Sequence, residues 1–250
     1  MRRPDRLWPA LVAGALAVVL GGCGSSAERV QRGPGTTAPE YVVRDSAQVR
    51  RQVQFQNALS LAGSDLQDGR LDSAEKRARE AARLDAGAPD AWVLLAGVAD
   101  RRGQTAQAGE LFRKAAELGP QRGDVLNNYG AWLCQQGRQA ESLAWFDRAL
   151  TAPGYATPEL AQANAGSCAL EAGQTVRGER DLRAALQRAP ANPVALEAMA
   201  QLSVSRSQFL EARAFVERRL SAAPATRSVL QFASQIEVRL GDQAAADRYL

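Results

Sequence analysis

The stretch that decides the fold is residues 89–120, which read PDAWVLLAGVADRRGQTAQAGELFRKAAELGP. Apolar residues recur in it at helical spacing on both sides of Gly103, and Pro120 closes the second segment. This pattern predicts two amphipathic helices joined by a tight turn. It returns with a period of 34 residues from Phe55 onward, so the helical hairpin is a repeated unit.

The period and its apolar positions resemble those of the tetratricopeptide (TPR) repeat. Within each repeat, apolar or small residues fall near positions 4, 7, 8, 11, 20, 24 and 27, a glycine near 15 and a proline near 32. Five full repeats and most of a sixth are visible, at residues 55–88, 89–122, 123–156, 159–192, 193–226 and 227–250. The first repeat departs from the pattern, because Asp65 stands at an apolar position and Ala86 where proline is expected.

A single hairpin of this kind cannot bury its apolar face alone, so neighbouring hairpins must stack. We therefore predict an all-α fold for residues 47–250: a right-handed superhelical stack of about six TPR hairpins. A short helical segment is expected at about residues 46–54, ahead of the first repeat. Two residues are inserted between the third and fourth repeats, which shifts the register there.

Residues 1–22 have the organisation of a secretory signal peptide. A basic segment is followed by an apolar run of 11 residues, Ala10–Leu20, which is too short to span about 30 Å of hydrocarbon. The run continues into LGGC at residues 20–23, which resembles the lipobox of bacterial lipoproteins. We therefore predict cleavage before Cys23 and stable lipid anchoring through it. The alternative is an ordinary signal peptide that happens to contain a cysteine.

Residues 23–46 are rich in Gly, Pro and small polar residues and lack an apolar period. This composition predicts a flexible tether between the lipid and the repeats. Gly24, and not aspartate, follows the cysteine. By resemblance to Gram-negative lipoproteins, this residue implies export to the outer membrane. The expected localisation is therefore the outer membrane, with the lipid on Cys23 as the anchor and the repeats facing the periplasm.

The composition argues against catalysis and against nucleic-acid binding. The chain contains no histidine, which removes the commonest general base and the commonest transition-metal ligand. Its net charge is +4, of which three arginines and one aspartate in the first 22 residues supply +2. The remaining charge is too weak and dispersed to favour nucleic acid. We expect a binding scaffold that is not an enzyme, with no cofactor, no metal and no small-molecule substrate.

Cys134 and Cys168 are the other two cysteines, and an exported protein meets an oxidising compartment. Cys134 lies at position 12 of the first helix of repeat 3, and Cys168 lies at position 10 of the first helix of repeat 4. Two positions on a helix are about 200° apart, and stacked helices face each other with opposite sides. We therefore predict a disulfide that clamps repeat 3 to repeat 4. Two buried free thiols are the alternative.

The concave groove of such a stack is lined by the first helices, and the predicted partner surface lies there. Leu59, Leu66 and Val93 place apolar side chains at groove positions, which suits an amphipathic helix or strand of a partner. Contact with the preceding helical segment, or packing between repeats, explains them equally well. Asn128 and Asn164 share repeat position 6. Their amides can bond either the backbone of a partner or a neighbouring helix.

Repeats 3 and 4 carry a more specific resemblance. Residues 125–138 read VLNNYGAWLCQQGR, and residues 164–170 read NAGSCAL. These segments resemble the NNYG, LC and GxC arrangement of type IV pilus biogenesis lipoproteins of the PilF/PilW type. The resemblance implies a pilotin, which binds the pilus secretin and promotes its outer-membrane localisation and multimerisation. The alternative is a TPR lipoprotein adaptor for peptidoglycan hydrolases or for outer-membrane protein assembly. Members of the family usually continue beyond the position of Leu250, which leaves the cap of the last repeat open.

Overall fold

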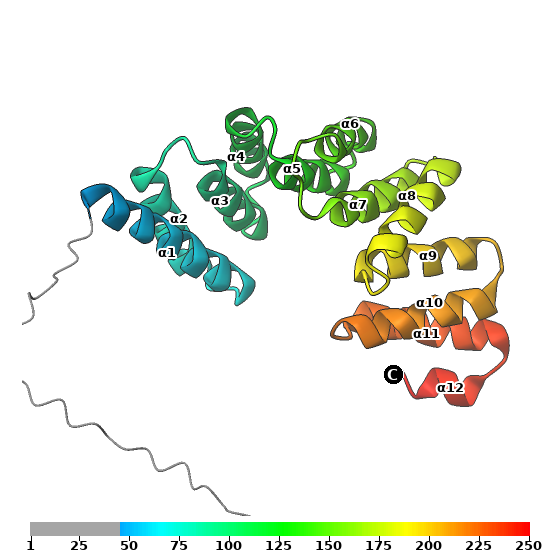
Figure 1. Cartoon of the computed structure of the whole chain (residues 1–250). Helices are drawn as coiled ribbons and strands as arrows, with labels where there is room; N and C mark the ends of the chain where they lie inside the picture. The colour runs from blue at the N-terminus through cyan, green and yellow to red at the C-terminus, as the bar shows by residue number, and fades with distance from the viewer. Residues whose placement is uncertain (1–45) are drawn as a thin grey trace, which may run out of the picture. The chain divides into compact units, whose positions relative to one another are not determined.

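The computed structural model describes residues 46–250, which form twelve α-helices and no strand. The helices pair into six hairpins: α1 (Ala47–Gln67) with α2 (Leu71–Leu84), α3 (Pro89–Arg101) with α4 (Thr105–Leu118), α5 (Gly123–Gln135) with α6 (Gln139–Leu150), α7 (Pro158–Glu171) with α8 (Thr175–Arg188), α9 (Pro193–Ser205) with α10 (Phe209–Ala222), and α11 (Arg227–Leu240) with α12 (Gln243–Asp247). The predicted all-α stack of TPR hairpins is confirmed for this range (Figure 1). The predicted signal peptide, the lipidation site Cys23 and the tether as far as residue 45 lie outside the described residues.

The helix boundaries follow from the residues that start and stop each helix. Pro89, Pro158 and Pro193 lie in the first turn of α3, α7 and α9, where a backbone N–H has no partner within the helix. Five hairpin turns contain a glycine with positive φ, at residues 69, 103, 137, 173 and 241. In the turn between α9 and α10, Ser207 adopts a φ of 60° in place of a glycine. Each described repeat therefore turns at the predicted position 15.

The hairpins stack because each second helix packs both on its own first helix and on the first helix of the next repeat. The first helices of repeats 1–5 also contact one another in order. These contacts bring the first helices closer together than the second helices, so the row of hairpins curves. In Figure 1, α3, α5 and α7 accordingly lie on the inner side of the curve, and α4, α6 and α8 lie on its outer side.

Small residues at repeat positions 8 and 20 let the two helices of a hairpin approach closely. In the first five repeats all of these residues are buried: Ala62 with Ala74, Ala96 with Ala108, Gly130 with Ser142, Gly166 with Gly178, and Ala200 with Ala212. The crossing in repeat 4 leaves no room for a side chain, since a Cβ on Gly166 would lie 2.9 Å from the carbonyl oxygen of Gly178. The pattern of small residues thus sets the distance between paired helices.

The start of the first repeat differs from the sequence-based expectation. The hydroxyl of Ser46 accepts a hydrogen bond from the Val49 N–H at 3.1 Å and caps α1. From Ala47 the helix runs without a break into the first repeat. The short segment expected at residues 46–54 is therefore the beginning of α1 and not a separate helix.

Leu61 stands at the apolar position 7 of repeat 1 but is 46% exposed. The equivalent residue of repeat 2, Leu95, is buried against Ala62 and Ala78 of the preceding repeat. Position 7 is therefore covered by the repeat before it, and the described residues place no repeat before α1. The apolar pattern is correct at Leu61, but the burial that it implies needs a neighbour.

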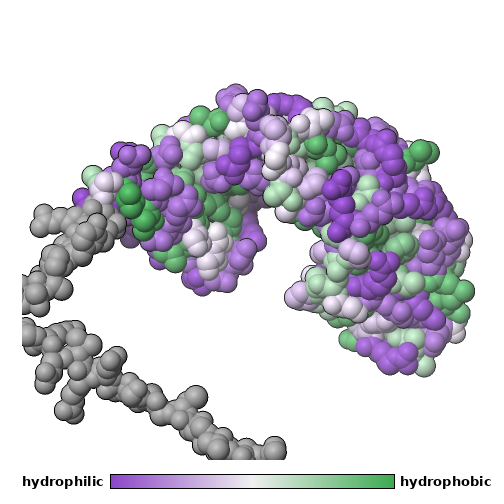
Figure 2. All heavy atoms as spheres, in the orientation of Figure 1, coloured by the Kyte–Doolittle hydropathy of each residue, from purple (hydrophilic) through white to green (hydrophobic). Residues whose placement is uncertain are grey.

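Hydrophilic residues cover most of the face of residues 46–250 that Figure 2 shows, and hydrophobic residues appear there in small separate patches. This distribution fits a row of amphipathic helices whose apolar sides face their neighbours. Within the same range, no helix combines the length and the apolar character that are needed to cross a membrane.

Candidate partner-binding surface

The first helices of repeats 1–3 form a hollow on the inner side of the stack. Its volume is about 360 Å³, and its lining residues all belong to α1, α3 and α5. Leu59, Val93, Leu94 and Val125 supply the apolar lining, and the exposed Asn128 adds an amide. The structure therefore brings together three of the predicted partner-binding residues, Leu59, Val93 and Asn128.

Arg122 pairs with two carboxylates at the rim of this hollow. Its guanidinium donates hydrogen bonds to Asp90 Oδ1 at 3.0 Å and to Asp124 Oδ2 at 2.6 Å. The hydrogen bond from Arg122 lowers the pKa of the Asp124 carboxyl, and the hydrogen bonds to Asp124 and Asp90 raise the pKa of Arg122. Because Arg122 offsets one of the two negative charges and bonds both carboxylates, the hollow presents to a partner mainly its apolar floor and the Asn128 amide, with one negative charge left at the rim.

Leu66 lies outside this hollow and packs between α1 and α3. It is half-buried, and its Cδ2 atom lies 3.0 Å from the point where a Cβ on Gly97 would stand. The carbonyl oxygen of Leu66 accepts a hydrogen bond from Arg101 at 2.9 Å. The position of Leu66 favours packing between repeats, which was one of the alternatives open for it on sequence grounds.

Asn164 ties two repeats together through a residue that the sequence analysis did not single out. Its Nδ2 donates a hydrogen bond to Oδ1 of Asn127 at 3.0 Å, which links α7 to α5. Asn127 is buried, whereas its neighbour Asn128 is exposed at the hollow. The two asparagines of the NNYG segment therefore have different environments, and only Asn128 is accessible to a partner.

The predicted disulfide between Cys134 and Cys168 is confirmed. It joins α5 to α7, and the two Cα atoms are 5.9 Å apart. Phe146 and Leu143 bury Cys168 from the side of α6. The bond closes a loop over a sequence separation of 34 residues, so the chain-entropy model expects it to stabilise the stack by about 3–4 kcal/mol.

Asp65, which breaks the apolar pattern of repeat 1, holds the turn between α1 and α2. Its carboxylate accepts hydrogen bonds from Ser73 Oγ at 2.5 Å, from Arg70 Nη2 at 2.7 Å and from Arg77 Nε at 2.8 Å. The Ser73 and Arg70 hydrogen bonds lower the pKa of Asp65 from 3.8 to about 2. A charged side chain is therefore accommodated at an apolar repeat position because three donors surround it.

The side chains at this surface suit the binding of a polypeptide segment. Within residues 46–250, no group of three or more His, Cys, Asp or Glu side chains is placed to hold a metal ion. The hollow offers aliphatic side chains, amides and arginine-paired carboxylates. Such a surface can receive apolar side chains and form hydrogen bonds with a backbone. The fold and this surface define a TPR interaction protein.

Two solved structures share the arrangement of the repeats. The crystal structure of PilW, a widely conserved type IV pilus biogenesis factor, superposes with a TM-score of 0.68 at 29% sequence identity, covering 79% of this chain and 90% of that one. Pseudomonas aeruginosa PilF superposes with a TM-score of 0.67 at 22% identity, covering 80% and 90%. The second likeness shows the fold alone. Both show the TPR fold, and the likeness to PilW agrees with the resemblance to proteins of the PilF/PilW type seen in the sequence.

Comparison at the level of sequence gives a different kind of relative. No protein-family model matches the chain. Cellulose synthase operon protein C of Pseudomonas fluorescens (strain SBW25) is 26% identical over 223 residues. The match covers 87% of this chain but 17% of that protein, so the chain spans only a small part of the length of this curated relative.

Proposed function

We propose that this chain is a type IV pilus biogenesis factor, an outer-membrane TPR lipoprotein that acts as a pilotin for the pilus secretin. The similarity to PilW carries the proposal, because it combines 29% identity with coverage of 79% of this chain and 90% of the other. The NNYG and GxC segments add support. Their residues Asn127, Asn164, Cys134 and Cys168 form the hydrogen bond and the disulfide that join repeats 3 and 4.

In this proposal the secretin contact lies in the hollow of the first three repeats. An apolar side chain of a secretin segment would enter between Leu59 and Val93, and the Asn128 amide would bond the backbone of that segment. The hollow supports this assignment because its floor is apolar while its carboxylates are already paired with Arg122. The pilotin would hold the secretin subunit until it inserts and multimerises.

The proposal includes a lipid anchor on Cys23 and a location at the periplasmic side of the outer membrane. The support is the LGGC sequence at residues 20–23 with Gly24 after it. The anchor would keep the repeats within reach of the membrane in which the secretin assembles. The proposed role is non-catalytic and requires no cofactor, small-molecule substrate or nucleic acid.

A pair of charge substitutions in the hollow tests the binding step. The full-length lipidated chain carrying L59D and V93D should fail to support secretin multimers, because a buried carboxylate in the hollow opposes apolar contact. Immunoblots of envelope fractions for secretin multimers and monomers provide the measurement. The matched control carries V176D and L210D, since Val176 and Leu210 are 86% and 70% exposed and lie outside the hollow. Normal multimers with L59D and V93D in a chain of unchanged helix content would contradict the proposed site.

Crosslinking of the wild-type chain in cell envelopes, followed by identification of the captured proteins, separates pilotin from adaptor. Recovery of the pilus secretin, lost with L59D and V93D but kept with V176D and L210D, is the expected result. Recovery of peptidoglycan hydrolases or of the outer-membrane insertion machinery without secretin would assign the chain to the adaptor class.

A further inference from the structure

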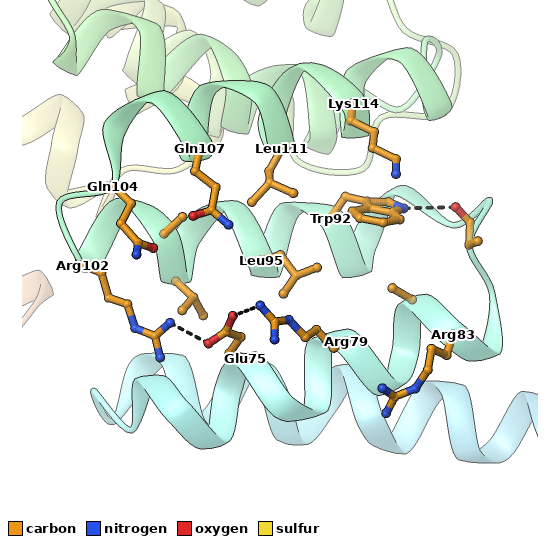
Figure 3. Close-up of a pocket in the computed structure, with 14 residues that line it drawn as sticks. Glu75, Arg79, Arg83, Trp92, Leu95, Arg102, Gln104, Gln107, Leu111 and Lys114 are labelled. Carbon is orange, nitrogen blue, oxygen red and sulfur yellow. Dashed lines mark hydrogen bonds and ion pairs between the residues drawn. The ribbon is translucent and has the colours of Figure 1, made fainter.

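A second recess lies on the outer side of the first two repeats. Its walls are α2 and α4, its floor is α3, and its volume is about 530 Å³ (Figure 3). Trp92 and Leu95 form the apolar floor, and Leu111 lines the α4 wall. This outer pocket shares no lining residue with the hollow that contains Leu59 and Val93.

The outer pocket is open because smaller residues stand where the next junction has aromatic ones. Between repeats 2 and 3, neighbouring rings pack with centroids 4.8 to 6.5 Å apart, and the residues involved are Phe112, Tyr129, Trp132 and Trp145. The residues 34 positions earlier, in the same order, are Ala78, Leu95, Val98 and Leu111. The backbones of the two junctions are therefore arranged alike, but side chains fill the space between repeats 2 and 3 and leave a pocket between repeats 1 and 2.

One further difference between the two junctions, at the position of Gly109, accounts for the polar end of the outer pocket. The Trp132 ring rests on Gly109, where a Cβ would lie 2.6 Å from Cη2 of the ring. Glu75 occupies the equivalent place one repeat earlier. Its carboxylate pairs with Arg79 and with Arg102, the latter at 2.5 Å. The only carboxylate among the residues that line the outer pocket is thus already neutralised.

At the other end, Lys114 of the α4 wall lies against the Trp92 ring, and Arg83 lines the α2 wall with its guanidinium turned away from that ring (Figure 3). Lys114 Nζ stands 3.3 Å from the centre of the Trp92 ring. The indole N–H of Trp92 donates to the carbonyl oxygen of Ala86 at 3.0 Å, which fixes the ring. Among the described residues, neither Arg83 nor Lys114 forms an ion pair with a carboxylate. This end of the outer pocket therefore carries positive charge without a balancing anion.

We propose that the outer pocket binds an acidic, amphipathic segment of a partner protein. One carboxylate of the segment would pair with Lys114 and a second one with Arg83, and a large apolar side chain would pack on Trp92 and Leu95. Unpaired cations beside an apolar floor are complementary to this combination of side chains. The proposal concerns a different face from the hollow and holds whether or not the chain acts on a secretin.

The lining of the outer pocket favours a peptide over a small molecule. Small-molecule sites orient their ligands with precisely placed polar groups. In residues 46–250 the buried side-chain polar atoms without a hydrogen-bond partner belong to Tyr155, Gln162 and Arg177, and none of these residues lines the pocket. Most of the polar groups that do line it are long side chains, and those of Arg79, Arg83, Gln107 and Lys114 are exposed on the two wall helices. Such side chains adapt to those of a docked segment.

Peptide binding tests the proposal directly. The probe is a fluorescein-labelled amphipathic helix of Leu and Glu, compared with the same peptide carrying Gln for Glu. Fluorescence anisotropy is measured on the full-length lipidated chain in zwitterionic nanodiscs, with empty nanodiscs as the blank. The wild-type chain should bind the Glu peptide at least tenfold more tightly than the Gln peptide, and the R83E/K114E variant should lose this preference. Binding of the Glu peptide no tighter than about 1 mM would overturn the proposal.

A matched variant separates the outer pocket from general electrostatics. Lys76 and Arg188 are exposed, lie outside the pocket and have no ion pair among the described residues. K76E/R188E therefore changes the net charge by the same amount as R83E/K114E, and it should keep the preference for the Glu peptide. An equal loss in both variants would overturn the proposal. Displacement of the peptide by hexanoate at equal concentration would assign the pocket to a small carboxylate and would overturn it as well.

Filling the outer pocket gives a second readout that does not depend on charge reversal. The E75G/V98W variant introduces into the open junction the contact that the Trp132 ring makes with Gly109, because residues 98 and 75 are the equivalents of these two residues one repeat earlier. It should weaken binding of the Glu peptide at least tenfold while far-UV circular dichroism stays unchanged. Undiminished binding by the folded variant would place the peptide elsewhere on the chain and would overturn the proposal.

Discussion

The junction between repeats 2 and 3 and the junction between repeats 1 and 2 have the same helices in the same order but different interiors. In the former, four aromatic residues and Gly109 interlock. In the latter, Leu95 and Val98 leave an outer pocket of about 530 Å³. The comparison shows that the backbone of a repeat protein does not decide whether the space between two repeats is filled or left as a pocket. The side-chain volume at a few equivalent positions decides it.

The largest expected effect is the loss of a ring from the filled junction. Trp132 is 6% exposed and donates a hydrogen bond to Asp100 at 3.1 Å. W132A should lower the free energy of unfolding by about 3–5 kcal/mol, because it leaves a large cavity. Chemical denaturation followed by circular dichroism gives the value. V98A, at the equivalent position of the open junction, should cost only about 1.5 kcal/mol. Equal losses would show that the two junctions do not differ in packing.

The next effect concerns the junction between repeats 3 and 4, which is joined covalently. C134A/C168A should lower the free energy of unfolding by about 3–4 kcal/mol on the chain-entropy model. The same denaturation experiment, with and without a reducing agent, measures it. Reduction should destabilise the wild-type chain and leave C134A/C168A unaffected. A wild-type chain that is insensitive to reduction would mean that the bond contributes little to stability.

A smaller effect on the free energy of unfolding is expected when one methyl group is added to the filled junction between repeats 2 and 3. G109A would place a Cβ 2.6 Å from the Trp132 ring, and the overpacking should cost about 1–3 kcal/mol. G63A is the control, because Gly63 lies in α1 with no atom within 4 Å of its added Cβ. That variant should gain about 0.5–1 kcal/mol from helix propensity. Opposite signs in thermal denaturation would support the comparison, and a stabilising G109A would refute it.

The smallest expected effect is a pH dependence in the first repeat, where Asp65 and its three hydrogen-bond donors form a polar cluster. The Ser73 and Arg70 hydrogen bonds lower the pKa of Asp65 to about 2, below its value of about 3.9 in an unfolded chain. The stabilisation from ionised Asp65 is therefore complete above pH 4 and disappears as the pH falls towards 2. D65N should melt at a lower temperature than the wild type at pH 7, and this difference should shrink between pH 4 and pH 2.

The control for this titration is E80Q, since Glu80 is exposed and forms no ion pair among residues 46–250. Its melting temperature should follow that of the wild type at every pH. A difference between D65N and the wild type that stays constant from pH 7 to pH 2 would show that the Asp65 charge is not the stabilising feature.

Much of the fold could be predicted because its information is periodic and local. Gly103 and Gly137 turn the chain at φ values of 72° and 74°, a conformation that glycine adopts without a steric penalty. Pro89 and Pro193 start helices within one residue of the predicted repeat boundaries. The Cys134–Cys168 bond could be predicted as well, because helix periodicity fixes which sides of stacked helices face each other.

The candidate site could be predicted only in part. The first helices were expected to line the groove, and Leu59, Val93 and Asn128 do share one hollow. Leu66 and Asn164 instead contact neighbouring helices. Sequence spacing gives the direction of a side chain on its own helix, but the position of the next helix decides whether that direction leads to solvent or into a contact.

The sequence by itself therefore determined the repeat, its turns and the covalent link, because each of these depends on residue type and spacing within the chain. The export signal stays a prediction. Only the tertiary structure decided that Asn127 is buried while Asn128 is exposed, and that Leu61 has no covering neighbour among the described residues. It also decided that the first junction stays open. These outcomes depend on whether side chains from different repeats fill the same volume, and that complementarity exists only once the hairpins are stacked.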